Sequence, residues 1–107
     1  MKALFDQVSA KCSQITTKKY STSFSLGIKF LSPSIRPAIF AIYGFVRLAD
    51  EVVDSFHGYN QKGLLEQLRK ETTAALEDKI SLNPIINSFQ QAVHQYSIDV
   101  ELIDAFL

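Results

Sequence analysis

The sequence predicts an all-α fold, an orthogonal helical bundle of five or six helices, and three observations lead to this prediction. Apolar residues recur at spacings of three and four along almost the whole chain, which is the period of an α-helix. The signals of β-strands, sustained alternation and Asn-Gly or Asp-Gly hairpin turns, are missing. The 107 residues are 47% hydrophobic and 21% charged, a composition typical of one globular domain.

The first helix is expected over residues 3–16, where apolar residues follow one another at spacings of four, four and three. These residues are Leu4, Val8, Cys12 and Ile15. A shorter second helix is expected from about Ser21 to Leu31. Its apolar side carries Phe24, Ile28 and Leu31. The segment 32–34, Ser-Pro-Ser, would then break the helical pattern.

The third helix is expected over residues 35–57 and is the least polar of all. Ser34 is its predicted N-cap, Pro37 lies in its first turn, and Gly58 suits its C-terminal end. A fourth, amphipathic helix is expected over residues 61–79. Its inward face is formed by Leu65, Leu68, Thr72, Ala75 and Leu76.

The fifth helix is expected to begin at Asn83-Pro84, with Asn83 as the cap, and to run to about Tyr96. Ser97 or Asp99 would cap a last helical stretch to Leu107. That stretch ends on an apolar stripe without a cap or a polar tail, so we expect a truncated chain. The stripe consists of Leu102, Ile103, Phe106 and Leu107.

Charge and cysteine content narrow the function classes. Eleven basic residues balance eleven acidic ones, so no nucleic-acid partner is expected. The single cysteine, Cys12, excludes an internal disulfide and favours a reducing cytoplasm. The N-terminus does not resemble a signal peptide, and the longest apolar run, 38–46, is far short of the ~20 residues needed to span a bilayer. We expect a cytoplasmic protein, with peripheral attachment to a membrane surface as an open alternative.

The predicted third helix carries a narrow charged line on an otherwise apolar surface. At about 100° per residue, Tyr43, Arg47, Asp50 and Asp54 fall within an arc of roughly 60°. The rest of the helix is almost entirely Ile, Val, Leu, Phe and Ala. Such a helix should be buried, with its charges facing a wet cavity or a bound ion.

Two carboxylates one turn apart, Asp50 and Asp54, suit a shared divalent cation such as Mg²⁺, whose shell is completed by waters and phosphate oxygens. Arg47 offers a forked donor that suits phosphate. The spacing also has a plain structural explanation. On a solvated helix, Arg47 would simply pair with Asp50 or Glu51 at the neighbouring turn.

The run from Tyr43 to Asp54 resembles the first aspartate-rich motif of squalene and phytoene synthases, Tyr-x-x-x-Arg-x-x-Asp-(Asp/Glu)-x-x-Asp. Upstream, Ser21-Thr22-Ser23-Phe24-Ser25 resembles the Ser-Phe segment of that family, and residues 32–37 match the loop before the motif helix. The order and spacing of the three agree over residues 20–56, and only the combination is specific.

The resemblance implies a partial isoprenoid synthase fold and a diphosphate site. Asp50 and Asp54 would bind Mg²⁺, or Mn²⁺, ions that bridge to a substrate diphosphate, with Glu51 as an outer ligand. Arg47 would contact the diphosphate directly. Metal ions and arginine neutralise the charge that develops on a leaving diphosphate.

The resemblance also assigns the substrate channel. Ser23 would hydrogen-bond near the diphosphate, while Phe24 and Tyr43 would line the reacting channel. An allylic cation needs a dry, aromatic-lined cavity without nucleophiles. The implied reaction of the intact enzyme is a head-to-head condensation of two farnesyl or geranylgeranyl diphosphates, as in carotenoid, sterol or hopanoid biosynthesis. NADPH would be needed only for squalene-type chemistry.

The sequence departs from the family in lacking a second aspartate-rich motif, and family members are much longer. We therefore expect residues 1–107 to be the N-terminal part of a synthase-like domain, inactive alone and prone to self-association. Two other function classes stay open. One is a non-catalytic family relative that acts as an assembly or binding protein, and the other is a plain helical interaction module. Binding of Mg²⁺ or Mn²⁺ would separate both from an enzyme.

Overall fold

Six α-helices and no strand make up the computed structural model, which describes residues 1–107. The helices are α1 (Lys2–Tyr20), α2 (Thr22–Ile28), α3 (Arg36–Asp54), α4 (Gln61–Asp78), α5 (Pro84–Tyr96) and α6 (Val100–Phe106). Helix therefore covers more than half of the chain. The predicted all-α fold and the number of helices are confirmed.

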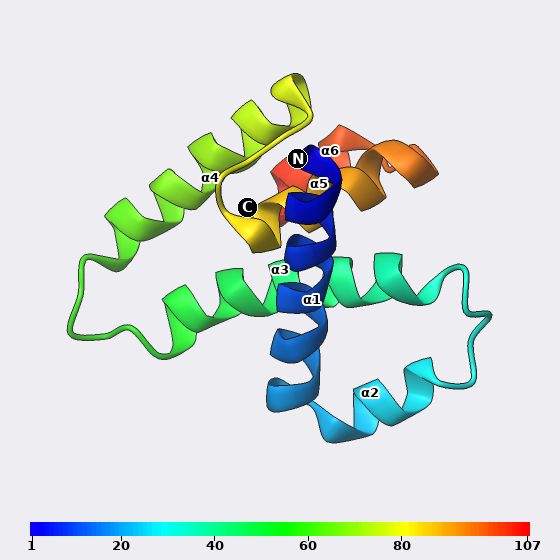
Figure 1. The fold of residues 1–107 in the computed structure, drawn as a ribbon. Coiled ribbons are helices and arrows are strands. Elements are labelled where there is room, and N and C mark those ends of the chain that lie inside the picture. Colours follow the sequence, from blue (N-terminus) through cyan, green and yellow to red (C-terminus); the bar gives the residue numbers. More distant parts are fainter.

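The helices cross one another rather than running side by side as a parallel bundle. Figure 1 shows α1 lying steeply across α3, and α1 also packs against α5. Helix α4 returns along α3 and α5, while α2 extends from the end of α1. Helices α1, α3 and α5 thus form the centre of the molecule, and α3 contacts both of the others.

The apolar core lies mainly between α3, α4 and α5. Its eight buried members are Phe45, Ala49, Leu68, Ala75, Ile86, Phe89, Val93 and Ile103. The rings of Phe45 and Phe89 stack with their centroids 3.8 Å apart. The inward face predicted for α4 is confirmed, because Leu68, Thr72 and Ala75 are buried. Removal of these side chains from water supplies the main driving force for folding.

Helix α1 presents hydroxyl side chains to the core, not the apolar residues that recur along it at helical spacing. Ser9, Ser13 and Thr17 are fully buried, whereas Leu4 and Ile15 are 54% and 52% exposed. The hydroxyls of Ser9 and Thr17 donate to the carbonyl oxygens of Phe5 and Ser13, four residues earlier. Their polar atoms are therefore satisfied inside the helix, and their small size lets α1 approach its neighbours closely.

Helices α1 and α3 approach each other closely at Ser13 and Gly44. A Cβ atom added at Gly44 would lie 3.3 Å from the Cα, Cβ and Oγ atoms of Ser13. On its other side, the Ser13 Oγ lies 2.5 Å from the Oγ of Ser88 on α5. Glycine at this position of α3 is therefore explained by the helix crossing, not by the backbone conformation of α3.

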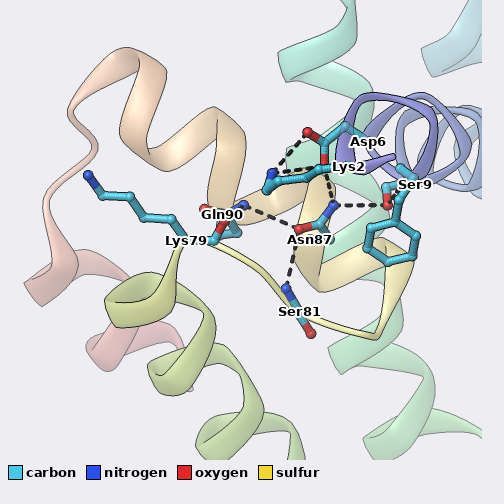
Figure 2. A network of polar contacts seen from close by, with 8 residues as sticks. Lys2, Asp6, Ser9, Lys79, Ser81, Asn87 and Gln90 are labelled. Carbon is cyan, nitrogen blue, oxygen red and sulfur yellow. Dashed lines mark hydrogen bonds and ion pairs between the residues drawn. The ribbon is translucent and has the colours of Figure 1, made fainter.

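A buried amide joins the start of α1 to α5 and the preceding loop (Figure 2). Asn87 donates to the Asp6 Oδ1 and to the Ser9 Oγ, both at 3.0 Å. Its own Oδ1 accepts from the backbone N–H of Ser81 and from the side chain of Gln90. The hydrogen bond from Asn87, followed by that from Lys2, lowers the pKa of the Asp6 carboxyl. Every polar group of the Asn87 side chain is thus used.

The boundaries of α3 differ from the prediction at both ends. Ser34 does not cap the helix, because the N-cap is Ile35 and the Ser34 hydroxyl pairs with Ser32 instead. At the other end α3 stops at Asp54 rather than near Gly58. The side-chain amide of Gln61 donates to the carbonyl oxygens of Val52 and Val53, which otherwise lack partners at a helix end.

Other boundaries follow the predicted caps. Asn83 accepts hydrogen bonds from the N–H groups of Ile85 and Ile86, with Pro84 as the first helical residue, and α5 ends at Tyr96 as predicted. Asp99, rather than Ser97, caps α6. Helix α1 extends to Tyr20, beyond the predicted end at 16, and α2 ends at Ile28 rather than Leu31.

Replacement of Phe45 by alanine should lower the free energy of unfolding by about 3–5 kcal/mol, because a fully buried ring stacked on Phe89 would leave a cavity. Urea unfolding followed by circular dichroism measures the change. Phe30→Ala is the matched control, since Phe30 is 91% exposed and its loss should change stability by less than about 0.5 kcal/mol. Equal effects of the two substitutions would contradict the position assigned to the core.

Candidate functional site

The charged line predicted on the third helix is present on α3. Because α3 is unbroken from Arg36 to Asp54, Tyr43, Arg47, Asp50 and Asp54 lie on one side, within an arc of roughly 60°. The opposite side, which includes Phe45 and the small buried residues of α3, faces the core. The expected burial of the whole helix is confirmed for that side only. Tyr43, Arg47 and Asp50 are half-buried, and Asp54 is exposed.

Arg47 is held by two neighbours. Its Nη2 donates to the Glu51 Oε2 at 2.5 Å, and its guanidinium carbon lies 4.5 Å from the centre of the Tyr20 ring. The hydrogen bond to Glu51 raises the pKa of Arg47 above its ordinary value. The Nε of Arg47 is buried and has no hydrogen-bond partner in the chain. The guanidinium is therefore fixed through Nη2, and its buried Nε–H is left without a partner.

Glu51 is the acceptor in this arrangement. The pKa of its carboxyl is lowered, first by a hydrogen bond from the Ser55 hydroxyl and then by the hydrogen bond and charge of Arg47. The simple helical pairing of Arg47 with Glu51, considered from the sequence, is therefore present. The role of Glu51 as an outer metal ligand stays a prediction, and here the carboxylate orients Arg47.

An aromatic pair connects α2 to the same side of α3. The rings of Phe24 and Tyr43 stack with centroids 4.8 Å apart and planes inclined by 24°. Phe24 is positioned by the start of α2, where the Ser21 hydroxyl accepts from the Phe24 N–H at 3.1 Å. The structure thus brings together the two residues predicted to line the channel. Tyr43 precedes Arg47 by one helical turn, so the aromatic pair lies beside the arginine.

Ser23 forms no side-chain hydrogen bond with Arg47, Tyr43 or the two aspartates. Its side chain is exposed and forms no hydrogen bond. Phe24, its neighbour in the sequence, is 44% exposed despite the stack on Tyr43. The site is therefore an open surface on one side of α3. The largest cavity of the chain lies elsewhere, between α1, α2 and the first turn of α3.

Asp50 and Asp54 are the carboxylates that remain available. Neither forms an ion pair, and neither accepts a hydrogen bond from another side chain. No group of three or more His, Cys, Asp or Glu side chains is arranged to hold a metal ion. Mg²⁺ bound together with a phosphate ligand needs only one or two protein carboxylates, because waters and phosphate oxygens complete its shell. Two free carboxylates one turn apart fit that requirement.

Two residues of the site were not found from the sequence. The signal for Ser55 was available, since it follows Glu51 by four residues, a spacing at which helical neighbours meet. Tyr20 gave no such signal. Its contact with Arg47 depends on the crossing of α1 over α3, which no local pattern records.

A family model described as squalene/phytoene synthase matches residues 17–107. The chain belongs to the squalene/phytoene synthase family. Within this family, the chain is 30% identical over 101 residues to a chloroplastic phytoene synthase of an Oncidium hybrid cultivar. It is 28% identical over 101 residues to the chloroplastic phytoene synthase 2 of Solanum lycopersicum. Both alignments cover 92% of the chain.

The chain spans 24% of the length of the Oncidium phytoene synthase and 31% of that of the tomato enzyme. No solved structure matches it closely enough to count as a relative. The squalene/phytoene synthase match includes the whole of α2 to α6 and the last turn of α1, so Tyr20 lies within it. No helix of the structure has the length and apolar character required to cross a membrane.

The carboxyl of Glu51 should titrate below the ordinary range of a glutamate, because Ser55 and Arg47 stabilise its charged form. Since the folded pKa is depressed, the stabilisation is present at neutral pH and is lost as the pH falls through the folded pKa. A ¹³C NMR titration of the side-chain carboxyl measures this value. Ser55→Ala should move the midpoint upward, whereas Ser23→Ala should not. An unchanged midpoint in Ser55→Ala would contradict the assigned cause.

Proposed function

We propose that the protein is a prenyltransferase that condenses two prenyl diphosphates head-to-head, with α3 supplying one diphosphate site. One observation carries the proposal. Asp50 and Asp54, one turn apart and without protein partners, lie on the same side of α3 as an arginine with an unused buried donor. Membership of the squalene/phytoene synthase family and the resemblance of this segment to its first aspartate-rich motif support the same assignment.

The chain's own residues divide the work in the proposed reaction. Asp50 and Asp54 would hold Mg²⁺, which when bound neutralises charge on the diphosphate. Glu51 and Tyr20 hold Arg47 in place, so that less side-chain entropy is lost when its free N–H groups bind phosphate. A pre-oriented cation costs no reorganisation at the moment when the leaving group gains charge.

The stacked rings of Phe24 and Tyr43 supply the apolar part of the proposed site. Aromatic faces attract a cation and offer no nucleophile to trap it, and stacked rings exclude water from the surface they cover. The two similar proteins are both phytoene synthases by name, which favours a phytoene-type reaction. That reaction needs no reductant, whereas a squalene-type reaction would require NADPH.

Substitution of Asp50 or Asp54 by asparagine in the full-length protein should lower diphosphate release from geranylgeranyl diphosphate at least about 100-fold, because each removes a charged metal ligand. Release is measured with Mg²⁺ in a coupled diphosphate assay. Asp78→Asn is the matched control, since Asp78 is an exposed aspartate at the end of α4 and should leave the rate unchanged.

Two results would count against this assignment. Full activity in the Asp50 and Asp54 variants would remove these residues from the mechanism. A full-length protein that binds neither Mn²⁺ nor prenyl diphosphates would instead fit a non-catalytic relative. Mn²⁺ binding, read by electron paramagnetic resonance, therefore accompanies the activity assay.

The fold also leaves an apolar groove open at the surface. This cavity of about 250 Å³ lies between α3, α5 and α6 and is lined only by hydrophobic residues. They are Ile42, Phe45, Val46, Phe89, Ile98, Leu102, Ile103 and Phe106. Leu102 and Phe106 are 67% and 46% exposed. Exposed apolar surface of this kind drives association when nothing covers it.

Residues 1–107 expressed alone should self-associate and release no diphosphate from farnesyl or geranylgeranyl diphosphate, because the apolar groove is bare and only one carboxylate pair is present. Sedimentation velocity measures the association. Phe106→Ser should shift the population toward monomer, whereas Leu82→Ser, at a residue 92% exposed outside the groove, should not. A stable monomer that turns over either substrate would contradict this prediction.

A further inference from the structure

The largest cavity of the chain lies away from the charged side of α3. It has a volume of about 450 Å³ and lies between α1, α2 and the first turn of α3. A second cavity of about 350 Å³ shares Gln14, Arg36 and Phe40 with it. The two cavities therefore adjoin, and together they are named the basic groove. Tyr43, Arg47, Asp50 and Asp54 do not line it.

The basic groove is lined by four cations and by no carboxylate. Lys18 and Lys29 line the larger cavity, Lys11 lines the smaller one, and Arg36 lines both. None of the four forms an ion pair. The chain as a whole has equal numbers of basic and acidic residues. The excess of basic residues is therefore a property of the groove and not of the whole chain. A depression with charges of one sign concentrates ligands of the opposite sign.

Arg36 is the fixed member of this set. Its Nε donates to the carbonyl oxygen of Leu31 at 3.0 Å, and its Nη2 donates to that of Lys29 at 2.8 Å. These bonds hold the segment between α2 and α3 against the start of α3. They also fix the guanidinium at the wall of the groove, with donors left over for a ligand.

A buried hydroxyl in the groove has no partner. Ser25 is 8% exposed, and its Oγ forms no hydrogen bond although it is shielded from solvent. Ser25 lines the larger cavity together with Lys18 and Lys29. Buried hydroxyls in folded proteins nearly always have a partner, and an exception is a common sign of a missing ligand atom.

The start of α3 adds a further positive element. Its N-cap, Ile35, provides no side-chain hydrogen bond to the first turn. Arg36 and Pro37, the first two residues of this 19-residue helix, line the smaller cavity. The N-terminal end of a helix carries partial positive charge and unpaired N–H groups, which favour anions.

We propose that the basic groove binds a phosphate-bearing ligand. Lys18, Lys29 and Arg36 neutralise the phosphate, and the Ser25 hydroxyl donates a hydrogen bond to one of its oxygens. The phosphate belongs either to a free phosphate compound or to an anionic phospholipid headgroup. The second source is included because Leu26 and Phe30, on α2 and just after it, are 51% and 91% exposed. This site does not depend on the proposed prenyltransferase activity.

Anion binding to the groove is tested first, by isothermal titration calorimetry of the full-length protein with inorganic diphosphate in the presence of EDTA. EDTA removes divalent ions, and an Arg47→Gln background removes the arginine of the α3 site. The double variant Lys18→Gln/Lys29→Gln should weaken binding about tenfold or more, because charged hydrogen-bond partners are lost. Ser25→Ala should weaken it less and leaves the charge of the groove intact.

The matched control is Lys62→Gln/Lys70→Gln, which removes two exposed lysines of α4 and should change the affinity by less than about twofold. Circular dichroism confirms that each variant is folded. A loss in the groove variant alone supports the site. Equal losses in the groove and control variants would overturn the proposal. So would a groove variant and a Ser25→Ala variant that change the binding of neither diphosphate nor anionic vesicles.

The source of the phosphate is tested by flotation with vesicles of phosphatidylcholine, with and without phosphatidylglycerol. Binding to the anionic vesicles that depends on Lys18 and Lys29 assigns the site to a lipid headgroup. Binding of diphosphate with the same dependence, and no preference for anionic vesicles, assigns it to a free phosphate compound. If neither probe binds with this dependence, the groove is not a phosphate site.

Discussion

Three helices meet at Ser13, and the geometry of the site depends on how closely they meet there. The Ser13 hydroxyl pairs with Ser88 of α5, and the Ser13 backbone faces Gly44 of α3. Small side chains at this crossing let α1 lie directly on α3, so that the last residue of α1, Tyr20, reaches the guanidinium of Arg47. The contact between Tyr20 and Arg47 therefore depends on Ser13, about two helical turns before Tyr20 on α1, and on Gly44, about one turn before Arg47 on α3.

Polar groups buried along α1 are tolerated because each has a defined partner. The Thr17 hydroxyl donates to a carbonyl of its own helix, and Asn87 uses both of its N–H groups and its oxygen. An apolar interface would permit α1 to slide along its neighbours, whereas a hydroxyl pair or a saturated amide is satisfied at one position only. On α2 and α3, by contrast, the Ser25 Oγ and the Arg47 Nε are buried without a partner. Both lie where a phosphate ligand is proposed.

Local sequence patterns predicted those features of the fold and the site that depend only on residues close together in the chain. The sequence predicted that a helix starts at Asn83-Pro84 and that Tyr43 and Asp50 share one side of a helix. Both predictions rest on patterns only a few residues long, a cap and the helical period. The buried face of α1 carries no apolar pattern, because its members are the hydroxyl residues Ser9, Ser13 and Thr17. The end of α3 was missed because Gln61 lies on the next helix. The basic groove combines residues of α1, α2 and α3, and no helical or cap pattern relates residues on three different helices.

The bonds from Gln61 to the carbonyls of Val52 and Val53 have a consequence for dynamics. Asp54 is the last residue of α3, and terminal turns fray more readily than any other part of a helix. If this turn unwound, Asp54 would leave the side of the helix that it shares with Asp50, and the distance between the two carboxylates would no longer be set. Gln61 of α4 thus stabilises the final turn of α3. How long Asp50 and Asp54 stay on the same side of the helix therefore depends on a residue outside the motif.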